Sequence, residues 1–74
     1  MADTAPALPT YRTIELAREG RLLRLTLNRP DAMNAVNLDL HDELPQALWF
    51  AQGDPGSDVV VLTGAGRAFS AGGA

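Results

Sequence analysis

The feature that most constrains this chain is an apolar run, Val-Val-Val-Leu at positions 59–62, which leads into a glycine-rich end. Turn-forming residues precede the run, and four glycines occur among the last twelve residues. A continuous apolar run is typical of a strand covered on both faces, as in a sheet with parallel neighbours. Covering both faces needs more sheet and a further helix than the sequence predicts. We therefore interpret the chain as one piece of a larger α/β domain and expect the remainder of its own polypeptide as a partner.

A β-hairpin is predicted before this strand. Residues 13–17 are expected to form its first strand, and Gly20 offers the positive φ of a tight turn. The second strand alternates leucine with polar residues in the period-two pattern of a half-buried strand, at Leu23, Leu25 and Leu27. Pro30 is expected to end that strand, because proline has no N–H to donate.

One amphipathic helix is predicted between the hairpin and the apolar run. Asn37 is expected to cap its N-terminus, and residues 53–56 are expected to stop it. The helix carries a single apolar stripe, made of Leu40, Leu44, Ala47, Leu48 and Ala51. Pro45 falls inside this pattern and is expected to kink or divide the helix, because it removes one backbone hydrogen bond.

Composition excludes several classes of function. The chain has no cysteine, and His41 stands alone, so disulfide scaffolds are excluded and no metal site is expected. The net charge is −3, and the six basic residues are scattered arginines without the basic stripe that nucleic-acid binding needs. The sequence lacks the ~18 consecutive apolar residues of a membrane span and the pattern of a secretory signal. Residues 1–11 are expected to form a flexible arm, and the expected location is cytoplasmic.

The glycine-rich segment fits neither of two common phosphate-binding motifs. The third glycine of a dinucleotide fingerprint falls at Phe69, and the segment has no lysine after a suitably spaced glycine, as a P-loop requires. Ser70 has no local histidine partner and does not lie in a nucleophile-elbow sequence. On spacing alone the segment is a glycine-rich turn.

Two longer motifs change that interpretation. Residues 25–37 resemble the pattern L-x-L-N-R-P-x-x-x-N-A-L/V-N of the enoyl-CoA hydratase/isomerase (crotonase) family. Residues 61–73 resemble the second motif of that family almost letter for letter. The motifs occur in the family's order and at its usual separation. The resemblance covers residues 12–74 and implies a crotonase-like α/β superhelix of repeated β-β-α units, of which this chain holds the N-terminal part.

The resemblance also implies a site. The substrate is an acyl-CoA thioester, with coenzyme A as part of the substrate and no separate cofactor. The N–H of Gly73 is one of two donors in an oxyanion hole for the thioester oxygen, and the second donor lies beyond this chain. Ala32, Met33, Ala71 and Gly72 line the CoA pocket together with Gly73, although loop packing is an equal alternative for Ala32 and Met33. A homotrimer or a dimer of trimers is the implied assembly.

Several functions remain open on the sequence. The leading hypothesis is hydration or isomerisation of an enoyl-CoA. C–C bond cleavage, dehalogenation and thioester hydrolysis are alternatives, because family members with these activities share the same two motifs. A third reading is a non-catalytic, truncated CoA-binding remnant, because the acid/base residues are absent and Ala74 stands where the family usually has aspartate. Asn34 is expected to fix its loop through side-chain-to-backbone hydrogen bonds.

Overall fold

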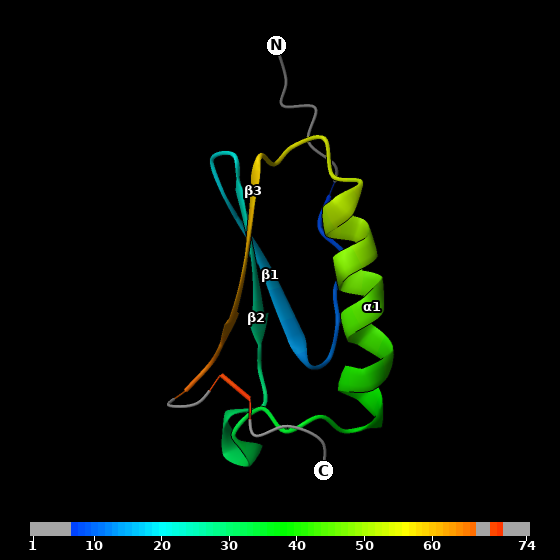
Figure 1. Ribbon diagram of the computed structural model, residues 1–74, viewed down its shortest axis with the longest axis vertical. Helices are drawn as coiled ribbons and strands as arrows, with labels where there is room; N and C mark the ends of the chain where they lie inside the picture. Colours follow the sequence, from blue (N-terminus) through cyan, green and yellow to red (C-terminus); the bar gives the residue numbers. More distant parts are fainter. Residues whose placement is uncertain (1–6, 67–68, 71–74) are drawn as a thin grey trace.

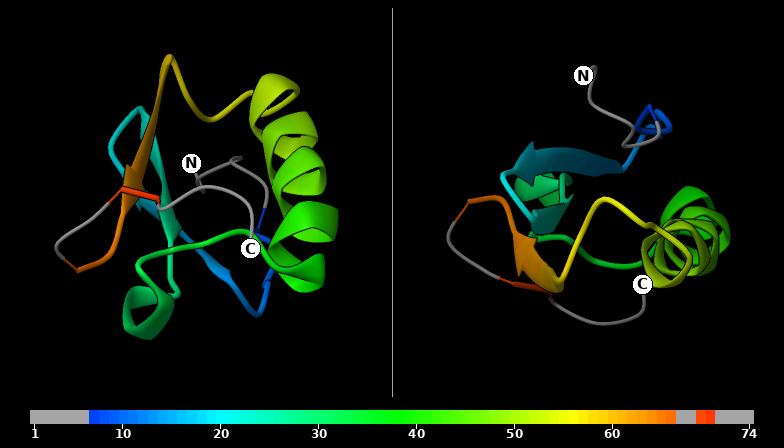
Figure 2. Two further views of the ribbon diagram at one scale, coloured as in Figure 1. Left: turned by 60° about the horizontal axis from the view of Figure 1, so that its bottom comes forward. Right: turned by 90° about the horizontal axis from the view of Figure 1, so that it is seen from above.

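The computed structural model describes residues 7–66 and 69–70 of the chain. The elements are β1 (Ile14–Glu19), β2 (Leu22–Leu27), the short 3-10 helix η1 (Pro30–Ala32), α1 (Leu38–Gln52) and β3 (Val59–Gly64). The three strands form one sheet in the order β1-β2-β3, and α1 lies beside it as a second layer (Figures 1 and 2). Within the described residues, no helix has the length and apolar character needed to cross a membrane.

The predicted hairpin is confirmed. β1 and β2 pair in antiparallel fashion, from Ile14 opposite Leu27 to Glu19 opposite Leu22. Gly20 has a φ of +59° in the connection between them, a conformation that glycine adopts without the steric cost of a side chain. β1 reaches Glu19, two residues further than expected, because every residue up to the turn finds a cross-strand partner.

The hydrophobic core lies between the hairpin and α1. It is formed by alternating residues of the two strands and by one face of the helix: Ile14, Leu23, Leu25, Leu27, Leu40, Ala47 and Ala51. Leu23, Leu25 and Leu27 of β2 are at most 3% exposed, as their alternation predicts. Leu8 and Tyr11 pack against this core although they fall within the expected N-terminal arm; residues 1–6 of that arm lie outside the described residues.

Helix α1 begins as predicted and continues where a break was expected. The Asn37 side chain accepts a hydrogen bond from the Leu40 N–H at 2.9 Å, which confirms it as the N-cap. The helix then runs unbroken through Pro45 to Gln52, so the expected division is wrong, and the alternative of a kink stays a prediction. Leu40 and Ala47, on either side of the proline, are fully buried, and their packing offsets the lost hydrogen bond. Leu48 is 44% exposed and lies outside the buried part of the predicted stripe.

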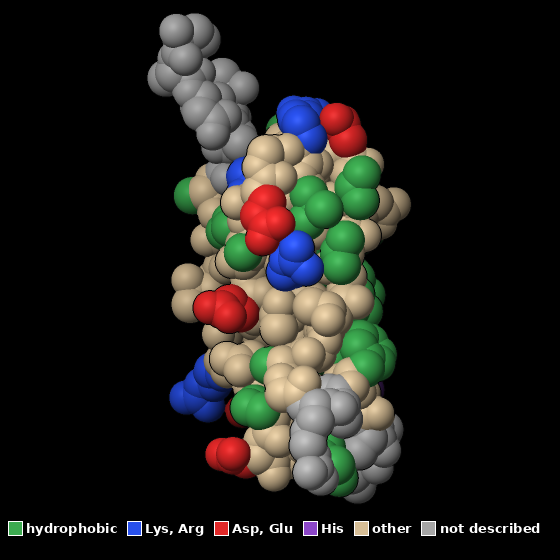
Figure 3. Space-filling model, turned by 90° about the vertical axis from the view of Figure 1, so that its left-hand side faces the viewer, with side chains coloured by type: hydrophobic (Ala, Val, Ile, Leu, Met, Phe, Trp, Pro, Cys, Tyr) green, Lys and Arg blue, Asp and Glu red, His purple; other side chains and the backbone are tan. Residues whose placement is uncertain are grey.

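Strand β3 pairs with β2 in parallel, as its apolar run predicts. Val60 pairs with Leu23 and Leu62 with Leu25, so both face the side of the sheet that carries the core. They are nevertheless 44% and 38% exposed, because within the described residues the core cluster stops at β2. Figure 3 views the molecule from the sheet side, opposite α1, and shows hydrophobic side chains at the surface among charged ones. The predicted cover on both faces of β3 is therefore not supplied by the described part of the chain.

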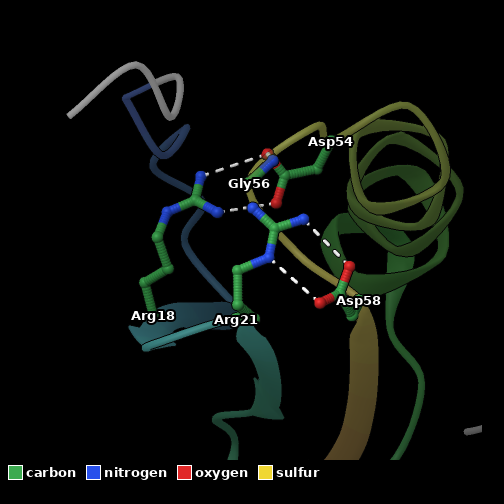
Figure 4. Close-up of polar contacts among 5 residues, drawn as sticks. All are labelled: Arg18, Arg21, Asp54, Gly56 and Asp58. Atoms are coloured by element: carbon green, nitrogen blue, oxygen red, sulfur yellow. Dashed lines mark hydrogen bonds and ion pairs between the residues drawn. The ribbon is translucent and has the colours of Figure 1, made fainter.

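Two arginine–aspartate pairs fasten the connection between α1 and β3 to the hairpin (Figure 4). Arg18 follows Ile14 and Leu16 on the core-facing side of β1, and its guanidinium donates to Asp54 Oδ2 at 2.7 Å. The Asp54 side chain is fully buried and also accepts the Gly56 N–H at 3.1 Å. Arg21 and Asp58 form a second, exposed pair at 2.9 Å. No local pattern in the sequence indicated either of these pairs.

The buried pair predicts a specific acid sensitivity. The hydrogen bonds from Arg18 hold the pKa of Asp54 below its ordinary value of 3.8, against the opposing effect of burial. A lowered folded-state pKa stabilises the fold above the unfolded-state value, and this stability is lost as the pH falls through the folded-state pKa. In thermal unfolding of the complete α/β domain between pH 7 and pH 2, the Asp54→Asn variant should be less stable than the unmodified protein at neutral pH but lose less stability on acidification. Asp42→Asn, at an exposed position on α1, is the matched control. Parallel pH profiles for Asp54→Asn and the unmodified protein would contradict the prediction.

Candidate functional site

The two sequence motifs meet at one edge of the sheet. Because β2 and β3 are parallel, the loops that follow them leave from the same side. We call residues 28–36 the first loop and residues 65–73 the second loop; residues 65, 66, 69 and 70 of the second loop are described. The Ala65 N–H donates to the Leu27 carbonyl at 2.8 Å, which extends the pairing to the base of both loops. Figure 1 shows η1 and the end of β3 close together at this edge.

The first loop is held in an unusual backbone conformation. After the short helix η1, Met33 and Asn34 have φ values of +50° and +55°. Asparagine tolerates this left-handed region, whereas methionine rarely enters it. The Met33 N–H donates to the Pro30 carbonyl at 3.1 Å and the Asn34 N–H to the Arg29 carbonyl at 2.8 Å. The Arg29 guanidinium also donates to the Ala35 carbonyl. These contacts within the loop impose its shape.

Asn34 joins the two loops. Its side chain is fully buried, and its Oδ1 accepts the Arg29 N–H at 2.7 Å. Its Nδ2 donates to the carbonyl of Ala65 in the second loop at 2.8 Å. The expected hydrogen bonding of the Asn34 side chain to backbone groups is thus confirmed. One of these hydrogen bonds joins the first loop to the second motif. The buried side chain thus supplies hydrogen bonds to partly buried backbone groups of both loops.

Two residues of the second loop pack on the first. The Ser70 hydroxyl donates to the backbone carbonyl of Asn34 at 2.8 Å. Gly66 has a φ of +82°, and a Cβ placed on it would lie 3.0 Å from the Cβ of Pro30. Glycine is therefore required at position 66 both by its backbone conformation and by the closeness of Pro30. The contact of Ser70 could not be predicted from the sequence, where its only signal is its position inside the second motif.

The structure brings some of the predicted site residues together. Ala32 ends η1 and is half-buried, and Met33 beside it is 46% exposed. Both lie in the first loop, which contacts the second. Ala71, Gly72 and Gly73 lie outside the described residues, so their expected roles stay predictions. Within the described part of the chain, no three His, Asp or Glu side chains form a group that could hold a metal ion.

Glu43 holds the segment just before β1, next to the first loop, where the Thr13 carbonyl accepts the Asn28 N–H at 2.7 Å. Its carboxylate accepts hydrogen bonds from the Thr13 hydroxyl at 2.6 Å, the Thr13 N–H at 2.8 Å and the Arg12 N–H at 3.0 Å. Burial, the largest influence, raises the pKa of Glu43, but these hydrogen bonds together lower it below its ordinary value. The carboxylate therefore stays charged at neutral pH and ties α1 to the start of β1 as a structural group.

Comparison with known proteins decides the family. The sequence model described as Enoyl-CoA hydratase/isomerase matches residues 17–74, which include both loops. The chain belongs to the enoyl-CoA hydratase/isomerase family. The resemblance of the two motifs is thereby confirmed.

Two relatives in this family are 40% and 35% identical in sequence to this chain over the matched residues. A probable enoyl-CoA hydratase of Mycobacterium bovis is 40% identical over 85% of this chain and 24% of its own length. A peroxisomal Δ(3,5)-Δ(2,4)-dienoyl-CoA isomerase of Arabidopsis thaliana is 35% identical over 88% of this chain and 24% of its own length. The chain spans about a quarter of the length of such relatives.

Solved structures confirm the crotonase-like α/β fold. An enoyl-CoA hydratase from Mycobacterium marinum superimposes with a TM-score of 0.80 at 50% identity, over 84% of this chain and 29% of that one. A monofunctional enoyl-CoA isomerase from Mycobacterium smegmatis gives a TM-score of 0.78 at 40% identity, over 82% and 30%. Hydratases and isomerases thus share the architecture that brings the two loops of this family member together.

The Asn34 bridge should be a main source of stability at the site. In the complete domain we expect Asn34→Ala to lower the free energy of unfolding by about 3 kcal/mol, because it leaves the partly buried Arg29 N–H and Ala65 carbonyl unpaired. Asn34→Gly keeps the positive φ accessible and isolates the hydrogen-bond loss. Asn28→Ala, at an exposed side chain in the same loop, should change the free energy by less than about 0.5 kcal/mol. Equal losses for Asn34→Ala and Asn28→Ala in urea titrations would show that the bridge adds nothing.

Proposed function

We propose that this chain supplies the thioester-binding loops of an enzyme that hydrates or isomerises enoyl-CoA substrates. The observation that carries the proposal is the buried Asn34 bridge between the two motif loops, with the second loop leading directly to Gly73. Family membership supports the reaction class, since the named relatives include both hydratases and isomerases. The activity belongs to the assembled protein, by which we mean residues 1–74 together with the polypeptide that completes the family domain.

The proposed chemistry depends on charge that develops at the thioester oxygen. In hydration, water adds to the β-carbon, the double-bond electrons move onto the thioester oxygen, and the resulting enolate takes a proton at the α-carbon. In isomerisation, a proton leaves the α-carbon and another returns at the far end of the conjugated system. Both routes pass through an enolate, so fixed N–H donors at that oxygen stabilise both. One such donor is worth about 3–4 kcal/mol in comparable sites.

The chain's own residues fill two roles in this proposal. Gly73 N–H donates to the thioester oxygen, and Ala32, Met33, Ala71 and Gly72 line the passage for the CoA portion of the substrate. Coenzyme A enters as part of the substrate. The second oxyanion donor and the acid/base carboxylates come from the polypeptide that completes the domain. Assembly as a homotrimer or a dimer of trimers, in the cytoplasm, completes the proposal.

The test begins with the intact mass of the purified protein, which shows whether further polypeptide accompanies residues 1–74. The assembled protein is then given crotonyl-CoA and, separately, 3-butenoyl-CoA. Hydration of crotonyl-CoA removes the ultraviolet absorbance of the conjugated thioester, whereas isomerisation of 3-butenoyl-CoA creates it. Either change supports the proposal and identifies the reaction. A folded, assembled protein that changes neither substrate overturns the proposal and favours another reaction of the family or a non-catalytic CoA-binding remnant.

A further inference from the structure

We propose that Arg29 is a positioning residue for binding of the CoA portion of the substrate, a role that rests on the proposed function. Its guanidinium donates to the carbonyl of Ala35, within the same loop. The Ala35 N–H donates in turn to the Ala32 carbonyl at 3.0 Å. The Arg29 side chain therefore holds Ala32, which the proposed function places against CoA, through one intervening residue.

The backbone of Arg29 closes the same loop. Its carbonyl accepts the Ala32 N–H at 3.0 Å and the Asn34 N–H at 2.8 Å. Its own N–H donates to Asn34 Oδ1 at 2.7 Å. The N–H, the carbonyl and the guanidinium of Arg29 thus all bond to residues of the first loop that follow it in the chain.

Arg29 differs from the other arginines in the described part of the chain. Each of the others forms an ion pair with a carboxylate: Arg12, Arg18, Arg21 and Arg24. Arg29 forms no ion pair with a described residue, and its guanidinium bonds to a backbone carbonyl instead. A hydrogen bond from a charged donor is stronger than one between neutral groups. The contact of Arg29 therefore acts on the shape of the loop.

The backbone conformation of this loop gives the contact its consequence. Met33 and Asn34 have φ values of +50° and +55°. Strained conformations of this kind persist only where surrounding contacts hold them in place. Without the guanidinium, fewer contacts oppose relaxation of the loop toward ordinary φ values. Ala32 and Met33 would then move, and their contacts with the CoA portion would weaken.

The experiment compares Arg29→Gln with Arg29→Lys in the assembled protein. We expect Arg29→Gln to raise KM for the active enoyl-CoA substrate about 10-fold with kcat nearly unchanged, because the lost contacts serve binding alone. Arg29→Lys keeps a charged donor and should recover most of the loss. Arg24→Gln removes an arginine that is paired with Glu19 on the hairpin and should leave KM within about twofold. Rates are referred to the concentration of folded sites, and thermal unfolding is measured for each variant.

A truncated substrate separates positioning from a general loss of structure. The same acyl group on N-acetylcysteamine keeps the thioester but lacks the nucleotide and most of the pantetheine portion of CoA. We expect Arg29→Gln to change kcat/KM for this thioester by less than about twofold. An equal fall for both substrates shows a purely structural arginine and overturns the inference. An unchanged KM in Arg29→Gln also overturns it, while the proposed function stands because the unmodified protein still turns over its substrate.

Calorimetric titration with CoA itself provides a readout that does not depend on turnover. We expect Arg29→Gln to weaken CoA binding about 10-fold and Arg24→Gln to leave it unchanged. If the unmodified protein binds CoA in this pattern but turns over neither enoyl-CoA, the proposed reaction falls and the role of Arg29 stands. If the unmodified protein does not bind CoA, the inference about Arg29 is wrong.

Discussion

Replacing Gly73 with proline should lower turnover by ~10²–10³-fold, the effect of removing one donor from an oxyanion hole. Proline has no backbone N–H, so the substitution deletes the proposed donor without changing charge. The loss should appear in kcat and in kcat/KM alike, because the hydrogen bond strengthens as charge moves onto the thioester oxygen. Steady-state kinetics of the assembled protein with its active enoyl-CoA substrate provide the measurement.

Gly66→Ala is the matched control for that variant. Gly66 lies earlier in the same loop, at a φ of +82° and with a Cβ position only 3.0 Å from Pro30. Alanine there should lower the unfolding temperature more than it lowers the rate per folded site, since strain and crowding act on the fold. Full activity of a folded Gly73→Pro protein would reduce Gly73 to a turn former. The family resemblance would then support the fold alone.

Residues 1–74 expressed by themselves should show no cooperative unfolding transition. Val59, Val60 and Leu62 of β3 are 52%, 44% and 38% exposed, and Trp49 on α1 is 77% exposed. A chain of this size buries only ~60% of the surface that its unfolded form exposes, which leaves little stability to offset such exposure. Thermal unfolding followed by circular dichroism, together with the sedimentation behaviour of the isolated chain, provides the measurement.

A single substitution on β3 sharpens this test. Val60→Lys should reduce aggregation of the isolated chain, because it places a charge on an exposed sheet edge. The same substitution should destabilise the assembled protein, where the remaining polypeptide is expected to cover β3. A monomeric residue 1–74 chain with a cooperative transition, or an assembled protein indifferent to Val60→Lys, would contradict the interpretation of β3.

Local patterns predicted the elements well. The alternation of leucines in β2, the glycine at position 20 and the cap at Asn37 each depend on neighbours in sequence, and each is observed. Pro45 shows the limit of a local rule, because buried packing on both sides of it keeps α1 continuous. The helix propensity of a single residue is overridden where tertiary packing contributes more to the free energy of folding.

The contacts that build the site were harder to predict, because they join distant residues. Asn34 reaches Ala65, 31 residues away, and Ser70 reaches Asn34 across 36. A periodic pattern in the sequence does not indicate partners so far apart. The two motifs therefore identified the loops but not the hydrogen bonds between them. Arg18 did carry a usable signal, since it continues the core-facing alternation of Ile14 and Leu16 and so predicts a buried cation in need of a carboxylate. Its partner Asp54 lies 36 residues away, beyond any sequence pattern.

The parallel pairing of β2 with β3 also bears on the order in which the molecule assembles. The hairpin joins neighbours through a two-residue turn, so its closure involves a short stretch of chain and is fast. The β2–β3 pairing and the Asn34–Ala65 bond form only after the intervening helix has been made and folded back, which is an intrinsically slow, non-local step. The edge of the sheet where the two loops meet is therefore completed late in folding. A folding intermediate that has formed only the hairpin and α1 contains both motifs, but its two loops are not yet joined.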